Sequence, residues 1–157
     1  MSETAAEKPA FREPLRRRRC LIPADGFYEW KRNGRQKQPY NIEMADDALF
    51  AFAGLWDWWK DREGRVIESC TILTTEANAL LRDIHSRMPV ILKPDDYARW
   101  LDPGVTDPAR VTDLLKPFDA RLMRCYPVSD RVNRVENDDE NCSREAPLKC
   151  TPQPTLF

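Results

Sequence analysis

The chain has 157 residues, of which 41% are hydrophobic and 10% aromatic, a composition typical of a folded domain and not of a disordered chain. This length favours one domain with one core and leaves little room for a second full domain. The 25 basic and 26 acidic residues nearly cancel, so the net charge argues neither for nor against a nucleic-acid partner. Charge is uneven along the chain, with a basic run at residues 16–19 and an acidic stretch at residues 136–140, and such local patches can steer a polyanion.

Turn residues and alternating apolar positions predict the elements of the first half of the chain. Residues 4–7, Thr-Ala-Ala-Glu, form a capping-box pattern that predicts the start of a short helix. Four strands are expected next, at residues 20–23, 27–31, 39–44 and 49–56. Gly26 closes the first turn, Asn33-Gly34 marks a hairpin and Asp46-Asp47 marks the turn after it.

The second half of the chain is predicted to mix short strands with clustered helices. Residues 66–73 are expected to form a buried strand, and a helix with one apolar face is expected from Thr74 or Thr75 to about Asp83. The remaining predicted elements are a strand at residues 89–92, helices at 94–101 and 107–115, and a last strand at 122–128. This pattern predicts an α+β fold with a curved, mainly antiparallel sheet or barrel-like core flanked by short helices.

The cysteines and the single histidine limit the metal and redox chemistry that the chain can perform. The five cysteines are Cys20, Cys70, Cys125, Cys142 and Cys150. Their odd number, wide spacing and lack of a Cys-x-x-Cys pair argue against a disulfide framework and a zinc site, so we expect no metal and no cofactor. The first three lie in apolar runs, where we expect small core side chains of a protein in a reducing compartment. With no membrane-length apolar stretch and no signal sequence, the expected location is the cytoplasm.

His85 and Glu29 are the side chains best suited to proton transfer. Histidine is the residue type that titrates near neutral pH, and His85 follows the predicted helix; the helix dipole alone would also favour a histidine there. Glu29 lies among aromatic residues of a predicted strand, where burial would make its carboxyl a usable acid or base. Alternatively Glu29 faces solvent, because alternation places it with Phe27 on one face of the strand. The residues alone leave both alternatives open.

Aromatic and basic side chains recur in the predicted strands and beside His85. They are Tyr28, Trp30, Lys31, Arg32, Arg35, Trp56, Trp58, Trp59 and Arg87. Aromatic faces stack on unpaired bases and arginines hold phosphates, which is how proteins bind single strands. An aromatic core with a solvated rim has the same composition, so this interpretation also stays open. A cysteine hydrolase built on Cys20 or Cys70 is not expected, because thiols buried in apolar strands are inert.

The order of several motifs resembles the SOS-response-associated peptidase (SRAP) family. The residues at 19–30, Arg-Cys-Leu-Ile-Pro-Ala-Asp-Gly-Phe-Tyr-Glu-Trp, are similar to the core motif of that family. The other segments that match, in the family's order, are residues 37–40 (Lys-Gln-Pro-Tyr), 53–56 (Ala-Gly-Leu-Trp), 71–78, 84–90 and 128–133. The resemblance covers residues 1–142, which we interpret as a partial SRAP domain, and a disordered tail is expected at residues 143–157.

The sequence departs from the family pattern at its first residues. SRAP proteins begin Met-Cys-Gly-Arg, and removal of the methionine exposes a cysteine that carries both an α-amine and a thiol, whereas the second residue here is Ser2. The segment 2–4 is instead similar to the end of an internal Asn-Ala-Arg-x-Glu-Thr motif. We therefore expect that about the first third of the family domain, with the nucleophile and an active-site asparagine, is missing from this chain. A separate N-terminal fragment is then a candidate partner.

The resemblance implies an enzyme that acts on abasic sites in single-stranded DNA during the SOS response to DNA damage. In the family, the N-terminal amine attacks the aldehyde of the abasic site and the thiol closes the imine to a thiazolidine crosslink; the same site also removes residues that precede the cysteine. By this resemblance Glu29 is the active-site carboxylate and His85 the proton shuttle, while Trp30, Arg87 and Thr74 bind DNA. A monomer associated with the nucleoid, and with no membrane partner, is implied.

The missing segment leaves two other functions open. Without a 1,2-aminothiol this polypeptide is expected to be unable to form the crosslink alone. The rival interpretations to the enzyme are a non-catalytic single-stranded-DNA-binding module that keeps the aromatic and basic side chains, and a degenerate fragment whose unpaired sheet edges favour aggregation.

Overall fold

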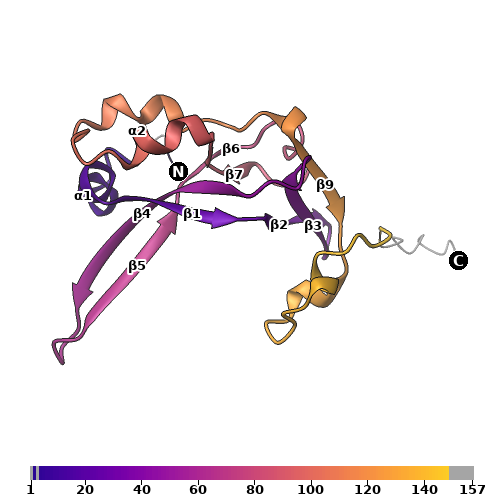
Figure 1. Ribbon diagram of the computed structural model, residues 1–157. Helices are drawn as coiled ribbons and strands as arrows, with labels where there is room; N and C mark the ends of the chain where they lie inside the picture. The colour runs from indigo at the N-terminus through magenta and orange to yellow at the C-terminus, as the bar shows by residue number, and fades with distance from the viewer. Residues whose placement is uncertain (1, 3, 149–157) are drawn as a thin grey trace, which may run out of the picture.

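The computed structural model describes residues 2 and 4–148, which form three antiparallel sheets and a few short helices (Figure 1). The strands are β1 (Arg19–Ala24), β2 (Gly26–Asn33), β3 (Gln36–Met44), β4 (Phe50–Lys60), β5 (Val66–Ile72), β6 (Thr74–Glu76), β7 (Arg87–Pro89), β8 (Ile91–Leu92) and β9 (Met123–Pro127). The α-helices are α1 (Pro9–Arg17) and α2 (Tyr97–Leu101), and the 3-10 helices are η1 (Pro94–Asp96), η2 (Pro108–Arg110), η3 (Thr112–Leu114), η4 (Ala120–Leu122), η5 (Asp130–Asn133) and η6 (Glu140–Cys142). The predicted α+β class is confirmed, although the sheets of the described residues stay open and close no barrel.

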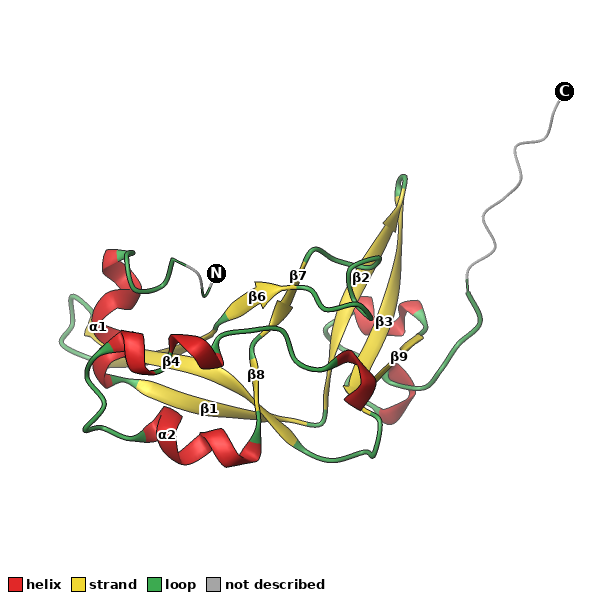
Figure 2. Cartoon of the chain, turned by 90° about the horizontal axis from the view of Figure 1, so that it is seen from above, coloured by secondary structure: helices red, strands yellow, loops and turns green. Residues whose placement is uncertain are grey.

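Strand β4 organises the largest sheet. It pairs with β1 along one edge, and with β8 and then β5 along the other. The second sheet has the order β2-β3-β9, and β6 pairs with β7. Figure 2 shows the two larger sheets end to end, with α1 and α2 beside β1 and β4. None of the helices of the described residues is long and apolar enough to cross a membrane.

The two faces of β4 belong to two different hydrophobic clusters. Leu55 and Ala53 pack with Trp100 of α2 and Leu15 of α1 in the first cluster. Phe52 belongs to the second cluster, which lies between the sheets and includes Ile42, Leu81, Met88 and Met123. Because successive residues of a strand point to opposite faces, one strand can serve both clusters. Only the inner half of β4 does so, since its residues are buried up to Leu55 and more exposed beyond it.

Arg19 joins the helices to the large sheet. Its side chain is 8% exposed, and its guanidinium donates to the backbone oxygens of Leu15 at 2.8 Å, Trp100 at 2.5 Å and Asp102 at 2.6 Å. The guanidinium also lies 5.7 Å from the ring centroid of Trp100. Its fork of donors suits several carbonyls at once, and burial lowers the pKa of this arginine from its ordinary value despite the nearby Asp102 carboxylate.

The turns between strands were predicted correctly, because their residue types have local causes. β1 and β2 are separated by Asp25, and Gly34 has a φ of +60° in the hairpin between β2 and β3. Asp47 has a φ of +59° in the turn before β4, a conformation that aspartate tolerates better than most residues.

The helix predicted from Thr74 to about Asp83 is wrong. Residues 74–76 form β6 instead, with Thr75 opposite Met88 of β7. The Asn78 side chain then accepts hydrogen bonds from the backbone of Leu80 and Leu81, both at 3.1 Å. This local bonding gives a series of turns where the apolar spacing had predicted a helix.

Three further predictions about secondary structure need correction. The capping-box helix at residues 4–7 is a turn, and α1 begins at Pro9, where proline has the fixed φ suited to a first helical position. The helix predicted at 107–115 consists of the two 3-10 helices η2 and η3. The strand predicted at 89–92 is divided at Val90 between β7 and β8.

The largest error in burial concerns β5. Residues 66–73 were expected to form a buried strand, but every residue of β5 is exposed, and Leu73 after its end is the buried one. Cys70 is therefore exposed and is not the core residue that its apolar neighbours predicted. The tail predicted to be disordered from residue 143 is ordered at its start, where Glu145 forms a β-bridge with Val128. Residues 149–157 lie outside the described part of the chain.

Candidate active site

Glu29 and His85 face each other across two different strand pairs. Glu29 lies in β2, opposite Tyr40 of β3, and His85 lies in the loop that connects β6 to β7. The distance from Glu29 Oε1 to His85 Nδ1 is 3.8 Å. The Glu29 side chain is 23% exposed and the His85 side chain 47%. The pair is therefore close enough for ionic attraction and still open to a solute.

The backbone of Arg87 fixes the orientation of the His85 ring. His85 Nδ1 is 3.1 Å from the Arg87 N–H and 3.0 Å from the Arg87 carbonyl oxygen. An unprotonated Nδ1 accepts from the N–H, whereas a protonated Nδ1 donates to the carbonyl or attracts Glu29. Protonation of Nδ1 therefore changes the hydrogen-bond partner of the ring without moving the ring, which is a useful property in a proton shuttle.

Arg87 and Thr74 form the wall next to the histidine. The Arg87 guanidinium donates to the Thr74 carbonyl at 2.6 Å and approaches the Thr74 hydroxyl at 3.5 Å. The same carbonyl accepts the backbone N–H of Ser2 at 2.7 Å. Ser2 is 5% exposed, so the beginning of the described chain packs beside this wall. The guanidinium is thus held in place by backbone, although Arg87 remains partly exposed.

Asn78 anchors the loop that leads to His85. The candidate residues chosen from the sequence did not include it. Its amide group donates to the carbonyl of Phe118 at 2.9 Å, and it is 8% exposed. Together with the hydrogen bonds that its oxygen accepts, this anchor holds the loop that ends at His85. A buried asparagine after a strand is a local signal for such a loop, and it could have been read from residues 71–78.

Trp30 lies apart from Glu29, His85, Arg87 and Thr74. It follows Glu29 in β2, so its side chain points to the opposite face of that strand. Its indole N–H donates to the Asn133 side-chain oxygen at 2.8 Å, which connects β2 to η5. The structure therefore brings Glu29, His85, Arg87 and Thr74 together, and leaves Trp30 on the far side of the sheet.

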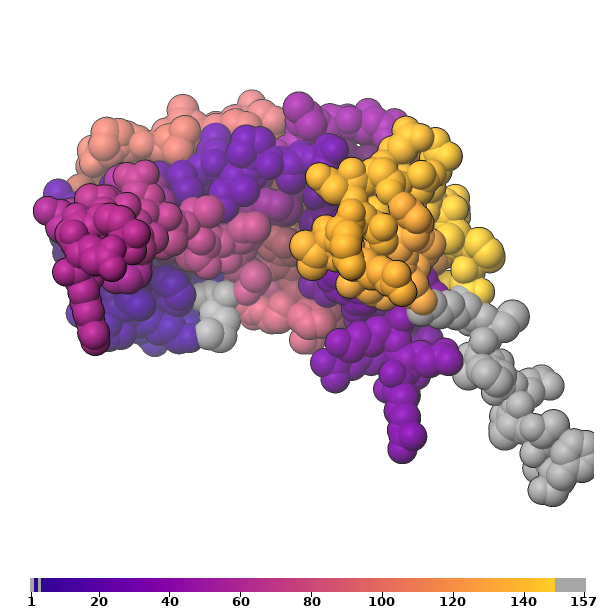
Figure 3. All heavy atoms as spheres, turned by 90° about the horizontal axis from the view of Figure 1, so that it is seen from below, coloured from indigo at the N-terminus to yellow at the C-terminus, as the bar shows by residue number. Residues whose placement is uncertain are grey.

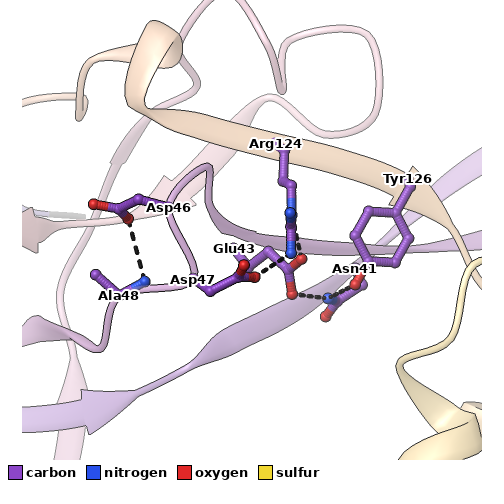
Figure 4. A network of polar contacts seen from close by, with 7 residues as sticks. All are labelled: Asn41, Glu43, Asp46, Asp47, Ala48, Arg124 and Tyr126. Atoms are coloured by element: carbon purple, nitrogen blue, oxygen red, sulfur yellow. Dashed lines mark hydrogen bonds and ion pairs between the residues drawn. The ribbon is translucent and has the colours of Figure 1, made fainter.

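The face that carries Trp30 also carries a network of polar side chains. Figure 4 shows Arg124 of β9 bonded to Glu43 of β3 and to Asp47 of the following turn, while Asn41 donates to Glu43 and to the Tyr126 hydroxyl at 2.9 Å each. A hollow of about 330 Å³ lies beside this network. Its lining is Asp25, Gly26, Tyr28, Asn41, Glu43, Asp47 and Ser143.

The described residues offer no metal centre at either face: no group of three His, Cys, Asp or Glu side chains among them is arranged to hold an ion. The chemistry that the Glu29–His85 pair can perform with its own atoms is proton transfer, because a carboxylate and an imidazole can each accept and donate a proton.

Comparison with known proteins extends this description. A model of the SOS response associated peptidase (SRAP) family matches residues 1–135. The chain is 49% identical over 138 residues to "Abasic site processing protein YoqW" of Bacillus subtilis, covering 87% of this chain and 62% of the relative. It is 34% identical over 181 aligned residues to "Abasic site processing protein HMCES" of Rattus norvegicus, covering 98% of this chain and 51% of the relative.

A solved structure agrees with the sequence comparisons. A protein from Bacteroides thetaiotaomicron superposes with a TM-score of 0.85 at 37% identity, over 92% of this chain and 64% of that chain. The chain thus spans less than two thirds of the relatives that it matches. The motifs, the mixed α+β fold and the family match agree, and the chain belongs to the SOS response associated peptidase family.

Proposed function

We propose that this chain contributes the proton-transfer half of an abasic-site processing reaction on single-stranded DNA. An abasic deoxyribose is mostly a closed hemiacetal, and only its open aldehyde reacts with an amine. His85 would move a proton between the anomeric hydroxyl and the ring oxygen, and Glu29 would hold the imidazolium formed on the way. The 3.8 Å separation of these two groups, at a partly exposed position, is the observation that supports this role.

The crosslink needs a second component. A thiazolidine forms when one carbon of an aldehyde bonds to an amine nitrogen and a thiol sulfur of the same 1,2-aminothiol, with loss of one water. The SRAP resemblance assigns that group to an N-terminal cysteine, and the five cysteines of this sequence lie at other positions. We propose that this chain alone forms no heat-stable DNA adduct and that a further SRAP segment supplies the aminothiol. Peptide hydrolysis and a role in the SOS response are proposed on the family description alone.

DNA contact is proposed for the wall beside the pair. The Arg87 guanidinium, held by the Thr74 carbonyl, would face a phosphate next to the abasic site. Trp30 points to the other face of β2, so it would stack on a base only if the strand passes around the edge of the sheet.

Free L-cysteine is itself a 1,2-aminothiol and can test the pair directly. We expect the chain to accelerate thiazolidine formation between L-cysteine and an abasic single-stranded oligonucleotide, measured by mass spectrometry. Glu29→Gln and His85→Ala should each lower the rate by about tenfold or more, whereas the exposed Glu136→Gln should not.

The outcome separates two functions. If neither substitution changes the rate while the oligonucleotide still binds, the chain is a non-catalytic single-strand-binding module and the proposal is wrong. Thermal melting of each variant checks that the fold is intact.

A further inference from the structure

The hairpin between β2 and β3 ends in a basic projection that the proposed reaction does not use. Its residues 31–37, Lys-Arg-Asn-Gly-Arg-Gln-Lys, include four cations and no carboxylate. We call residues 31–37 the basic finger. The side chains from Arg32 to Lys37 are exposed. Figure 2 shows the hairpin of β2 and β3 projecting beyond its neighbours, and in Figure 3 its purple tip stands out from the surface.

The basic finger continues the strand that carries Glu29, and its base is held in place. The pairing of β2 with β3 runs without a break from Glu29 to Asn33. At the base, the side chain of Gln38 is 4% exposed and donates to the carbonyl of Val128 at 3.0 Å, which ties β3 to the chain after β9. The finger therefore has a fixed direction, and at about 3.3 Å per residue its tip lies roughly 15 Å beyond Glu29.

The positive charge of the basic finger stays largely without a counter-charge. Lys31, Arg32 and Arg35 form no ion pair with any carboxylate of the described residues. The β4–β5 hairpin also projects, but its basic residues alternate with acidic ones, and Arg65 pairs with Asp61 at 2.7 Å. A solvated surface usually mixes both signs of charge. A projection of one sign instead attracts a polyanion.

Cations lie on both faces of the basic finger. Lys31 is on the face of Glu29, because residues two apart in a strand point the same way. Arg32 shares the other face with Trp30 and lies opposite Lys37 of β3. A DNA strand that passes from the Glu29 face around the edge of the sheet to the Trp30 face therefore meets a cation on either side.

We infer that the basic finger binds backbone phosphates of the single strand that flanks the abasic nucleotide. This inference rests on the proposed function, which places that nucleotide beside Glu29 and His85. Because stacked nucleotides rise by about 3.4 Å each, the tip reaches a phosphate roughly four nucleotides away. Phosphate contacts carry no sequence information. The finger would therefore lengthen the DNA footprint on one side of the site without adding a sequence preference.

Oligonucleotides with flanks of different length can locate the contact. Each single strand carries one tetrahydrofuran analogue of the abasic site and a fluorescein label. The short strand has about two nucleotides on either side, and two further strands extend either the 5′ or the 3′ flank to about twelve, well past the reach of the finger. Fluorescence anisotropy at several salt concentrations gives Kd and its salt dependence for the full chain.

The double variant Arg32→Gln/Arg35→Gln tests the finger itself. We expect it to weaken binding of one extended strand about fivefold or more, and to lower the slope of log Kd against log salt by about one to two, because each lost phosphate contact releases fewer counterions. Binding of the short strand should not change. The matched control is Lys60→Gln/Arg62→Gln, which removes two exposed cations from the other projecting hairpin and should leave every Kd as it is.

Four results would overturn the inference. They are an unchanged Kd on every strand, equal losses on the short and extended strands, an equal loss in the control variant, and a polyglutamate chain that binds as tightly and with the same dependence on Arg32 and Arg35. Melting temperatures of the variants check the fold, since exposed substitutions should leave it intact. The proposed reaction is judged separately, by the rate with L-cysteine on a short strand with a true abasic site, which the finger substitutions should not alter.

Discussion

Arg19 shows how a single side chain can connect three elements. It begins β1, bonds the end of α1 through the Leu15 carbonyl, and bonds α2 and its following residue through Trp100 and Asp102. The bonds to the Leu15 and Trp100 carbonyls are buried, so removal of the guanidinium would leave these two oxygens without a donor. The basic run at residues 16–19 therefore includes one arginine with a structural role, which a count of charges cannot reveal.

Arg19→Ala is expected to lower the free energy of unfolding by about 2–4 kcal/mol, because it leaves buried carbonyls without donors. The control is Arg17→Ala, whose side chain is 60% exposed and paired with Glu13 on the surface, and which should change stability by less than about 1 kcal/mol. Urea unfolding of both variants measures the difference. Equal losses would mean that the Arg19 hydrogen bonds contribute little.

The thiol of Cys125 is expected to make the fold less stable at alkaline pH. Burial raises the pKa of its thiol from 9.0 to about 11. Between these values the unfolded chain releases a proton that the folded chain retains, so unfolding becomes easier as pH rises from about 9 to 11. Below pH 9 both states hold the proton and this effect disappears.

Thermal melting at pH 8 and pH 10.5 tests this linkage. The melting temperature of the original chain should fall more between the two values than that of Cys125→Ala, which has no thiol at this position. Cys70→Ala is the comparison for an exposed cysteine and should behave as the original chain does. A Cys125→Ala variant that loses as much as the original would contradict the assignment.

Among the elements, the inner half of the large sheet depends on a close approach between β1 and β4. A methyl group on Gly54 would meet Cys20 Sγ and Ile22 Cδ1, both at 2.8 Å. Real contacts do not come so close, so Gly54→Ala should force the packed Cys20 and Ile22 side chains to shift and cost about 1–3 kcal/mol of stability.

Gly104→Ala provides the control for the Gly54 substitution. Its methyl group would meet the Asp102 carboxylate at 3.1 Å, and that group can move aside. Chemical denaturation should show a change of less than about 0.5 kcal/mol for this variant. Similar losses at both positions would mean that alanine acts through the unfolded chain and not through contact with β1.

The element predictions succeeded where the cause is local. Gly34 and Asp47 occupy turns with positive φ, and their residue types indicate such turns directly. The helix after Thr74 failed because its apolar spacing suits both a helix and a series of turns, and the pairing of β6 with β7 decided between them. Pairing between distant segments is not visible in a local window of sequence.

At the scale of the whole molecule, the candidate site was predicted through the family resemblance more than through the residues. Position alone left Glu29 and His85 with two interpretations each, and the fold brings them within 3.8 Å. Trp30 was grouped with them through the family resemblance, whereas alternation along β2 points its side chain to the other face, where it bonds Asn133. The exposure of β5 could not be foreseen, since its apolar residues suit a buried strand and its exposure depends on how distant segments pack.

The exposed turn between β4 and β5 has a consequence for how the chain can be divided. A break after residue 62 would leave β1 and β4 in one piece and β5, β8 and β9 in the other, yet β4 pairs with β5 and β8, and β3 with β9. Residues 1–62 and 63–157, synthesised as separate polypeptides, should therefore complement each other and elute as a single species from a sizing column. If the two fragments do not associate, the covalent connection through the hairpin turn is required to bring the two halves together.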